Sequence, residues 1–437
     1  MSALAASAEE LECWRSGVAD DPGSPQQWLH LNAAGASPTP DAAHATFVAY
    51  LELERRVGGY EAASQRNGSA AARDAIAELL GCDEDEVALC LSAQAAWTSA
   101  LNTLGLGSRD RVLFATSSEY AGNVVAALQL CGRTGASLEV VPSSACGAVD
   151  LAALETALAE QGASNTTLVC LCHINSGCSD VQDAAAVGAL VRTAAAKAAT
   201  AAVVGRGGGR RFAYLLDACQ SFGQLPVDVR AIGADYACGT GRKWLRGPRG
   251  TGFLYARRDS EAAAAEPPLL DHSGASWAGG DSRTYRMDCT ARRFELWERS
   301  EAAFASLAVA VRFALDVGLG RIHTRSAALA AAMREGLSCV EGVELRCGGA
   351  CAIVVFDVAG CGWGAAELKE ALRQRRIAVS VTPSTHSFDE EFRRRGPAVR
   401  ASPHYFNTEG EVRRFVEAVQ EIVVSRPPGL PGGGGGS

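Results

Sequence analysis

From about residue 69 to residue 232, short apolar runs alternate with Ala-rich stretches of helical pattern. This alternation is the rhythm of a parallel sheet whose strands are joined by helices that cover it. The strands expected here and just beyond are 87–91, 111–115, 138–141, 167–172, 212–216, 236–239 and 252–256, with helices over 151–160 and 183–199. The pattern therefore predicts one large α/β domain.

A second rhythm begins near residue 292. A long helical pattern runs from Arg292 to about Gly318, and a further helix reaches Leu337. The pattern then predicts a strand over 351–358, a helix over 364–373, a strand over 377–381 and a helix over 409–424. The expected organisation is an N-terminal arm (1–30), a large domain (31–291), a connecting helix with a smaller α+β domain (292–424) and a disordered tail (425–437).

Composition narrows the class of protein. The chain has 437 residues, 48% of them hydrophobic, and a net charge of −8. This length allows a sizeable core and exceeds one ordinary compact domain. An acidic balance argues against a nucleic-acid partner, because duplex binding depends largely on Lys and Arg neutralising phosphates.

Segments that would direct the chain to a membrane or an oxidising compartment are not evident. The first 21 residues are Ala-rich and acidic, unlike a signal or transit peptide. No apolar run is long and clean enough to span a bilayer. The 15 cysteines form no metal-type C-x-x-C pair, so buried reduced thiols are a better interpretation than disulfides or a metal site. We therefore expect a cytoplasmic protein with no metal and no membrane partner.

The most informative residues lie at the ends of two neighbouring predicted strands. Asp217 follows the apolar run that ends at Leu216, and Lys243 lies in a Gly-rich loop after the next strand. Open α/β sheets bind ligands at such strand ends. A carboxylate and an amine placed in this way suit pyridoxal 5′-phosphate (PLP), because the carboxylate keeps the pyridine nitrogen protonated and the amine forms the imine. On spacing alone, an Asp that caps a turn and a surface Lys explain the pattern equally well.

The surrounding residues resemble the class V aminotransferase family of fold-type I PLP enzymes. The resemblance rests on the motif Asp217-x-x-Gln220 and on the run K-W-L-x-G-P-x-G-x-G-F-L-Y that starts at Lys243, and it covers nearly the whole chain. It implies PLP as the cofactor and an α/β fold: a large domain with a mixed, mostly parallel sheet flanked by helices, and a smaller α+β C-terminal domain. It also implies a homodimer, for which Trp277 in a Gly-rich loop is a candidate contact, although a solvent loop is equally compatible.

The same resemblance implies roles around the lysine. Lys243 would carry PLP as a Schiff base, Asp217 would pair with the pyridinium nitrogen, and Gln220 would donate to the ring hydroxyl. Thr240 and Arg242 would hold the phosphate. Arg242 stands where desulfurases commonly have His, which leaves its contact open.

Earlier segments add further candidates. Ser92 follows a strand and opens a helix, so it is a candidate N-cap, and the N–H groups of Ala93 and Gln94 can bind an anion there. The resemblance places the PLP phosphate at this turn. It also implies that Tyr120 stacks on the ring and that Asn175 contacts the ring hydroxyl or the substrate.

A motif near the C-terminal end supplies the substrate contact. Residues 399–409 resemble the family motif R-x-S-x-x-x-Y-N-T-E, with Phe406 in place of the Tyr. The resemblance assigns Arg400 to the substrate α-carboxylate, a role that suits the planar pair of donors on a guanidinium. Asn407 and Thr408 are expected to cap the final helix.

The reaction is less constrained, because PLP supports transamination, racemisation and β-elimination, and the protein selects among them by orientation. Segment 381–398 contains His386 but no Cys, whereas desulfurases carry a persulfide-forming Cys on the corresponding loop. Segments 30–35, 57–62 and 293–298 resemble the branch of the ergothioneine C–S lyase and isopenicillin N epimerase. We predict a C–S lyase that eliminates sulfur from a cysteine conjugate or its sulfoxide. An aminotransferase or epimerase is the alternative, and a cysteine desulfurase or an inactive scaffold is less favoured.

Overall fold

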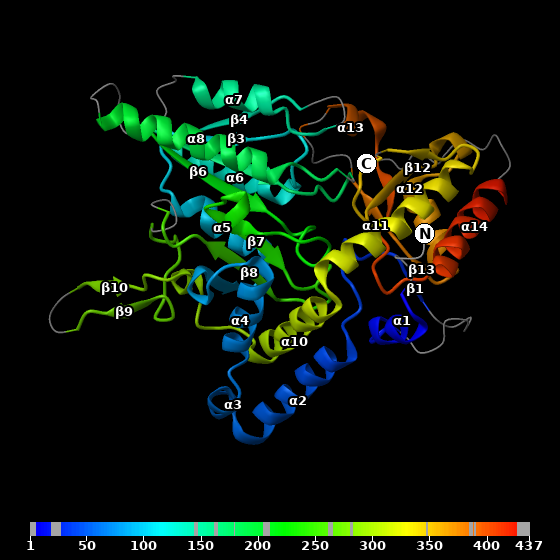
Figure 1. Ribbon diagram of the computed structural model, residues 1–437, viewed down its shortest axis with the longest axis horizontal. Helices are drawn as coiled ribbons and strands as arrows, with labels where there is room; N and C mark the ends of the chain where they lie inside the picture. Colours follow the sequence, from blue (N-terminus) through cyan, green and yellow to red (C-terminus); the bar gives the residue numbers. More distant parts are fainter. Residues whose placement is uncertain are drawn as a thin grey trace.

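A computed structural model describes residues 6–18, 28–143, 147–160, 165–178, 180–203, 210–260, 265–279, 283–346, 348–383, 388 and 390–425. At its centre lies a seven-stranded sheet of order β2-β8-β7-β6-β5-β3-β4 (Figure 1). Its strands are β2 (Val87–Cys90), β3 (Arg111–Phe114), β4 (Ser137–Val140), β5 (Thr166–Cys172), β6 (Arg211–Asp217), β7 (Tyr236–Thr240) and β8 (Gly252–Ala256). Only β8 runs against its neighbours in this sheet, so the predicted mixed, mostly parallel sheet is confirmed.

Helices cover both faces of this sheet. On one face lie α5 (Ala93–Thr103) and α6 (Ala121–Thr134), and on the other lie α4 (Gly68–Leu80), α7 (Leu151–Ala159) and α8 (Ala184–Val203). Strands buried on both faces appear in the sequence as continuous apolar runs. The predicted ends of all seven strands lie within one residue of the observed ends, and for every strand except the partly exposed β4 this burial explains the agreement.

The single helix predicted from Arg292 to Gly318 is wrong. The chain instead forms a 3₁₀ turn, η2 (Ala291–Phe294), then a non-helical stretch, then α10 (Glu301–Val317), which is capped by Ser300. The non-helical stretch turns Glu295 into the interior, where two arginines and a backbone N–H bind its carboxylate. A buried carboxylate must keep such partners, and this requirement overrides the local helical pattern.

The C-terminal part carries a second, antiparallel sheet of order β11-β12-β15-β14. Its strands are β11 (Glu344–Leu345), β12 (Val354–Asp357), β14 (Ser380–Thr382) and β15 (Ala398–Ala401), and its helices include α11 (Leu319–Ser338), α12 (Ala365–Gln374), α13 (Glu390–Arg395) and α14 (Glu409–Ser425). The strand predicted over 377–381 is divided between two sheets. Its first half, β13 (Ile377–Ala378), pairs in parallel with β1 (Leu29–His30), and its second half is β14.

The remaining elements are α1 (Ala8–Trp14), α2 (Asp41–Val57), α3 (Gly59–Gln65), η1 (Glu84–Glu86), α9 (Val229–Ile232), η3 (Ala359–Cys361) and the hairpin of β9 (Ala275–Trp277) and β10 (Tyr285–Met287). This hairpin projects from the left of the molecule in Figure 1. The N-terminal β1 and the C-terminal helices lie together at the opposite end. The limits of the predicted domains stay a prediction, and His386 and the predicted tail beyond residue 425 fall outside the described residues.

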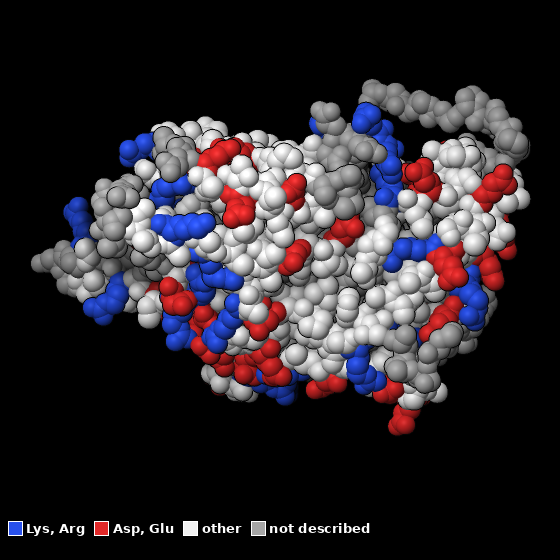
Figure 2. All heavy atoms as spheres, turned by 45° about the horizontal axis from the view of Figure 1, so that its top comes forward, with Lys and Arg blue, Asp and Glu red and all other residues white. Residues whose placement is uncertain are grey.

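Among the helices that the structure describes, none is by itself long and apolar enough to cross a membrane. Of these helices, only α10 and α11 taken together have the length and apolar composition of a membrane span. A bend of 79° separates the two. Both helices contribute to the core, for example through Leu307 and Leu329. On the face shown in Figure 2, acidic and basic side chains are interspersed around a broad uncharged area.

Candidate active site

A cavity opens at one edge of the central sheet. Its lining consists of Ser92, Ala93 and Gln94 after β2, Tyr120 after β3, Cys172, Ile174 and Ser176 at the end of β5, Asp217, Cys219 and Gln220 at the end of β6, and Thr240, Arg242 and Lys243 at the end of β7. These five strands run in one direction, so their carboxyl ends meet at a single edge. The cavity thus brings together nine of the ten residues predicted to bind the cofactor.

The start of α5 forms one wall of the cavity. Ser92 is the predicted N-cap, since its hydroxyl accepts a hydrogen bond from the Ala95 N–H at 3.1 Å. The first N–H groups of a helix point outward and attract anions. A Cβ on Gly252 would lie 2.4 Å from the carbonyl carbon of Ser92, so only glycine allows β8 to approach this turn.

Arg242 adds positive charge to the same cavity. Its side chain is partly buried and donates a hydrogen bond to the carbonyl of Gly35. Burial and the charge of Arg249 lower the pKa of Arg242. An anion bound beside it would offset the cost of holding this guanidinium away from water.

The carboxylate of Asp217 lies at the floor, where the residue is only 5% exposed. Its oxygens accept hydrogen bonds from the Asn123 side-chain amide at 2.8 Å and from the Cys219 N–H at 3.0 Å. The amide of Asn123 also donates to Glu119 at 3.0 Å, and Glu119 accepts the Tyr120 N–H at 2.7 Å. Burial, with a further contribution from the charge of Asp217, raises the pKa of Glu119 to about 8. At neutral pH the Glu119 carboxyl group therefore holds its proton.

Sequence reasoning gave no role to Glu119 or Asn123, although both stand in the segment that supplies Tyr120. Their spacing of four residues at a helix start was the available signal, because such residues face each other on a helix. It also missed Cys172, Ile174, Ser176 and Cys219 as lining residues. Cys219 was marked by its place between the Asp and the Gln of the motif, and Ile174 and Ser176 by their place on either side of Asn175.

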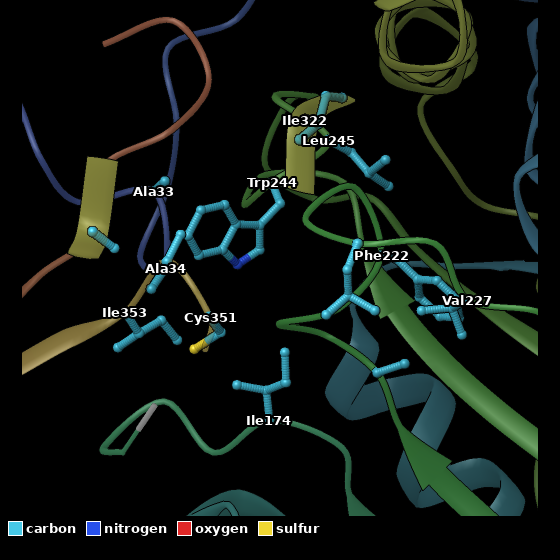
Figure 3. Packing of buried hydrophobic residues seen from close by; sticks show 14 of the residues in the cluster. Ala33, Ala34, Ile174, Phe222, Val227, Trp244, Leu245, Ile322, Cys351 and Ile353 are labelled. Atoms are coloured by element: carbon cyan, nitrogen blue, oxygen red, sulfur yellow. The ribbon is translucent and has the colours of Figure 1, made fainter. Parts of the chain in front are cut away.

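Gln220 and Trp244 fix the backbone beside the lysine. The indole N–H of Trp244 donates to the Gln220 side-chain oxygen at 2.8 Å, and the Gln220 amide donates to the carbonyl of Ala34 at 3.1 Å. Figure 3 shows the indole packed beside Ala33 and Ala34. The side-chain amine of Lys243, in contrast, makes no hydrogen bond or ion pair with the part of the chain that the structure describes, and only the backbone carbonyl of this residue accepts one, from the Arg246 N–H. Its backbone is held while its amine is left available.

Asn175 is the one predicted cofactor residue that does not line the cavity. Its amide donates to the carbonyl of Glu119 at 2.9 Å, and its oxygen accepts the Gly177 N–H at 2.7 Å. These bonds support the segment that carries Tyr120. A direct contact of Asn175 with cofactor or substrate stays a prediction.

Arg400 approaches the cavity region from β15 of the smaller sheet and is 8% exposed. Its hydrogen bonds go to the carbonyl of Ser176 and the side-chain oxygen of Asn32, both at 3.3 Å, and its Nε has no partner. No carboxylate among the described residues pairs with it. Burial and the charge of Arg242 lower the pKa of Arg400 to about 10. A buried guanidinium that has no carboxylate partner and an unbonded Nε is suited to bind the carboxylate of a ligand.

Comparison with known proteins identifies the family. The family model for aminotransferase class-V matches residues 30–415. The chain belongs to the class-V aminotransferase family. Among curated relatives, a probable cysteine desulfurase of Methanothermobacter thermautotrophicus is 26% identical over 407 residues, covering 90% of this chain and 94% of the relative. An isopenicillin N epimerase of Amycolatopsis lactamdurans is 30% identical over 228 residues, covering 48% and 52%.

Solved structures of other proteins share the fold of this chain. A cysteine desulfurase from Thermococcus onnurineus superposes with a TM-score of 0.76 at 22% identity, covering 91% of this chain and 95% of that one. A cystine C–S lyase superposes with a TM-score of 0.77 at 20% identity, covering 91% and 98%. The predicted fold-type I architecture is confirmed.

Members of the class-V aminotransferase family are PLP-dependent enzymes, and this chain is one of them. When bound, PLP withdraws electrons from the α-carbon of an amino-acid substrate. The residues present fit this cofactor. The cavity offers a helix start and an arginine for a phosphate, the buried carboxylate of Asp217 for a pyridinium nitrogen, and the unpaired amine of Lys243.

Proposed function

We propose that this enzyme is a C–S lyase, which performs β-elimination on a cysteine conjugate or its sulfoxide and yields a released sulfur species, pyruvate and ammonia. The curated relatives named cysteine desulfurases support a cysteine-like substrate whose C–S bond is broken. The proposal differs from desulfuration in the fate of the sulfur, which leaves without transfer to a protein thiol.

The observation that carries this distinction is the composition of the segment between β14 and β15. Residues 383–397 contain no cysteine. The two thiols that line the cavity belong to the floor around Asp217: Cys172 is the last residue of β5, and Cys219 follows β6. The segment before Arg400 therefore offers no thiol to take up the substrate sulfur as a persulfide.

Each side chain has a role in this proposal. Lys243 holds the cofactor and removes the substrate α-proton, because its amine has no competing partner. Asp217 keeps the pyridine nitrogen protonated, and Tyr120 stacks on the ring. Arg400 binds the α-carboxylate and thereby orients the bonds at the α-carbon.

The remaining predicted residues hold the cofactor in place. Ser92, Ala93, Gln94, Thr240 and Arg242 surround its phosphate. Gln220 donates its second amide hydrogen to the ring hydroxyl, since the first is bound to Ala34.

Epimerisation is the alternative function. It is favoured by the 30% identity to an isopenicillin N epimerase over 228 residues. To decide, purified enzyme is incubated with cysteine conjugates, without and with an acceptor keto acid, while pyruvate, ammonia and substrate stereochemistry are followed. Pyruvate and ammonia in equal amounts without an acceptor are expected. Inversion at the α-carbon without pyruvate, or turnover that requires the acceptor, would reject the lyase.

A further inference from the structure

Three thiols surround Asp217. In the register of the central sheet, Cys172 of β5 and Cys238 of β7 pair with Asp217 of β6 on its two sides. Residues paired in adjacent parallel strands project to the same face, so these three side chains form one row. Cys219 joins them from the loop two residues after Asp217 and lines the cavity.

The atoms that could bind a cation are close together. A carboxylate oxygen of Asp217 and the Sγ atoms of Cys219 and Cys238 all lie within 4.8 Å of one another. Zinc ligands surround the ion tetrahedrally at about 2.0–2.3 Å, which places ligand atoms roughly 3.3–3.8 Å apart. Small side-chain shifts would therefore suffice. Two sulfurs and one carboxylate suit soft or borderline cations and not Mg²⁺ or Ca²⁺.

We propose that Asp217, Cys219 and Cys238 form a binding site for a thiophilic divalent cation, such as Zn²⁺ or Cd²⁺, in the cofactor-free chain. Asp217 and Cys219 both line the cavity, so an ion held there can keep its fourth position open toward water. Both are parts of one short segment, and the Cys219 N–H already fixes the Asp217 carboxylate. The site goes beyond the proposed function, since no catalytic step uses these two thiols.

A second group of atoms, from Glu119, Cys172 and Asp217, is equally compact. It offers only one sulfur, and Asn123 and a backbone N–H already occupy the Glu119 carboxyl group. The group with two thiols is therefore the better ligand set. If Asp217 also pairs with the pyridine nitrogen, as the proposed function requires, the cation and the cofactor exclude each other.

The test uses the full-length chain, freed of PLP with hydroxylamine and titrated with Cd²⁺. Ultraviolet thiolate-to-cadmium absorbance and calorimetry report the binding, and Zn²⁺ is added as a competitor. One tight Cd²⁺ ion per chain is expected, displaced by Zn²⁺ and unaffected by Mg²⁺. Cys219→Ala and Cys238→Ala should each weaken this binding about tenfold or more. Cys170→Ala, which removes another buried thiol of β5, is the matched control and should bind as the unaltered chain does.

Binding that is absent, or that persists undiminished in the Cys219→Ala chain, would overturn the site. Cys219 lies in a loop, so this variant decides the question even if Cys238→Ala does not fold. PLP is then added to the Cd²⁺-loaded chain, and slower recovery of cofactor absorbance is expected. Tight binding through both thiols with unhindered PLP loading would uphold the cation site and contradict the proposed role of Asp217.

Discussion

The acidic and basic side chains of the active site differ in whether they have hydrogen-bond or ionic partners. Asp217 accepts two hydrogen bonds and is fixed in position. Lys243 and Arg400 have no acidic partner among the described residues. Because an unpaired buried guanidinium is costly, a carboxylate gains most at Arg400, while the partly buried amine of Lys243 is free to react with an electrophile.

Replacing Lys243 by Ala removes the amine that holds the cofactor and takes the α-proton. We expect loss of the visible imine absorbance and a fall in elimination rate of at least about 10²–10⁴-fold. Absorbance spectra and pyruvate release check this, with the exposed Lys197→Ala as the control. An unchanged imine band in the Lys243 variant would refute the assignment of this lysine.

Replacing Arg400 by Lys keeps the charge and removes the planar pair of donors. The KM for the substrate should rise about 10–100-fold, with a smaller change in kcat, because the lost contact is to the α-carboxylate. Steady-state kinetics measure this, and Arg55→Lys on the exposed face of α2 should leave both constants unaltered. A kcat loss at constant KM would contradict a substrate-binding role.

Glu119 makes the stability of the fold depend on pH. Its pKa is about 8 in the folded chain against an ordinary value of 4.5, so the folded state binds more protons between these values. Stability therefore falls as pH rises from about 4.5 to 8. In Glu119→Gln the decline between pH 5 and pH 8.5 should be smaller by on the order of 3–5 kcal/mol. Urea unfolding at both pH values tests this, and parallel curves for the two proteins would count against it.

At the scale of elements, the sequence correctly predicts those helices and strands whose formation depends on local sequence pattern. The strands of the central sheet and helices such as α11 and α14 follow from uninterrupted apolar or amphipathic runs. The errors occur where a distant partner decides the conformation. The break before α10 exists because Glu295 bonds to Arg73, and the run 377–381 is divided because β1 pairs with its first half.

The non-helical stretch before α10 is held by Glu295, whose carboxylate is fully buried between Arg73, Arg299 and the Leu89 N–H. Glu295→Gln would remove the charge between the two arginines, so that Arg299 keeps only Glu301 and Arg73 has no ionic partner among the described residues. We expect the free energy of unfolding to fall by about 3–5 kcal/mol. Urea denaturation measures this, with Glu52→Gln in an exposed helical pair as a control expected to change it by under about 1 kcal/mol.

At the scale of the whole molecule, one arginine joins the ends of the chain to the active-site loop. Arg246, three residues after Lys243, is 1% exposed and donates to the carbonyls of Trp14 and Pro38 and to the Tyr405 hydroxyl, each at 2.9 Å. It also donates to the carbonyl of Ser16. The N-terminal segment, the C-terminal segment and the lysine loop are thus fixed to one side chain.

Arg246→Met keeps most of the side-chain volume and removes every donor. The free energy of unfolding should fall by about 3 kcal/mol or more, because several buried acceptors lose their partners. Amide exchange at residues 14–18 should also accelerate, which mass spectrometry can follow. The exposed Arg413→Met is the control. Unaltered exchange in the Arg246 variant would show that this segment is held by other contacts.

The sequence by itself determined the α/β class, the strands of the central sheet and the family, because these rest on local patterning and on motifs of neighbouring residues. Through the family motifs it also named nine of the thirteen residues that line the cavity, which meet because the carboxyl ends of parallel strands converge. Tertiary structure alone decided the bridge that Asn123 makes between Glu119 and Asp217, the break at Glu295 and the clustering of thiols around Asp217. These features depend on contacts between segments far apart in the chain, and no local pattern records such contacts.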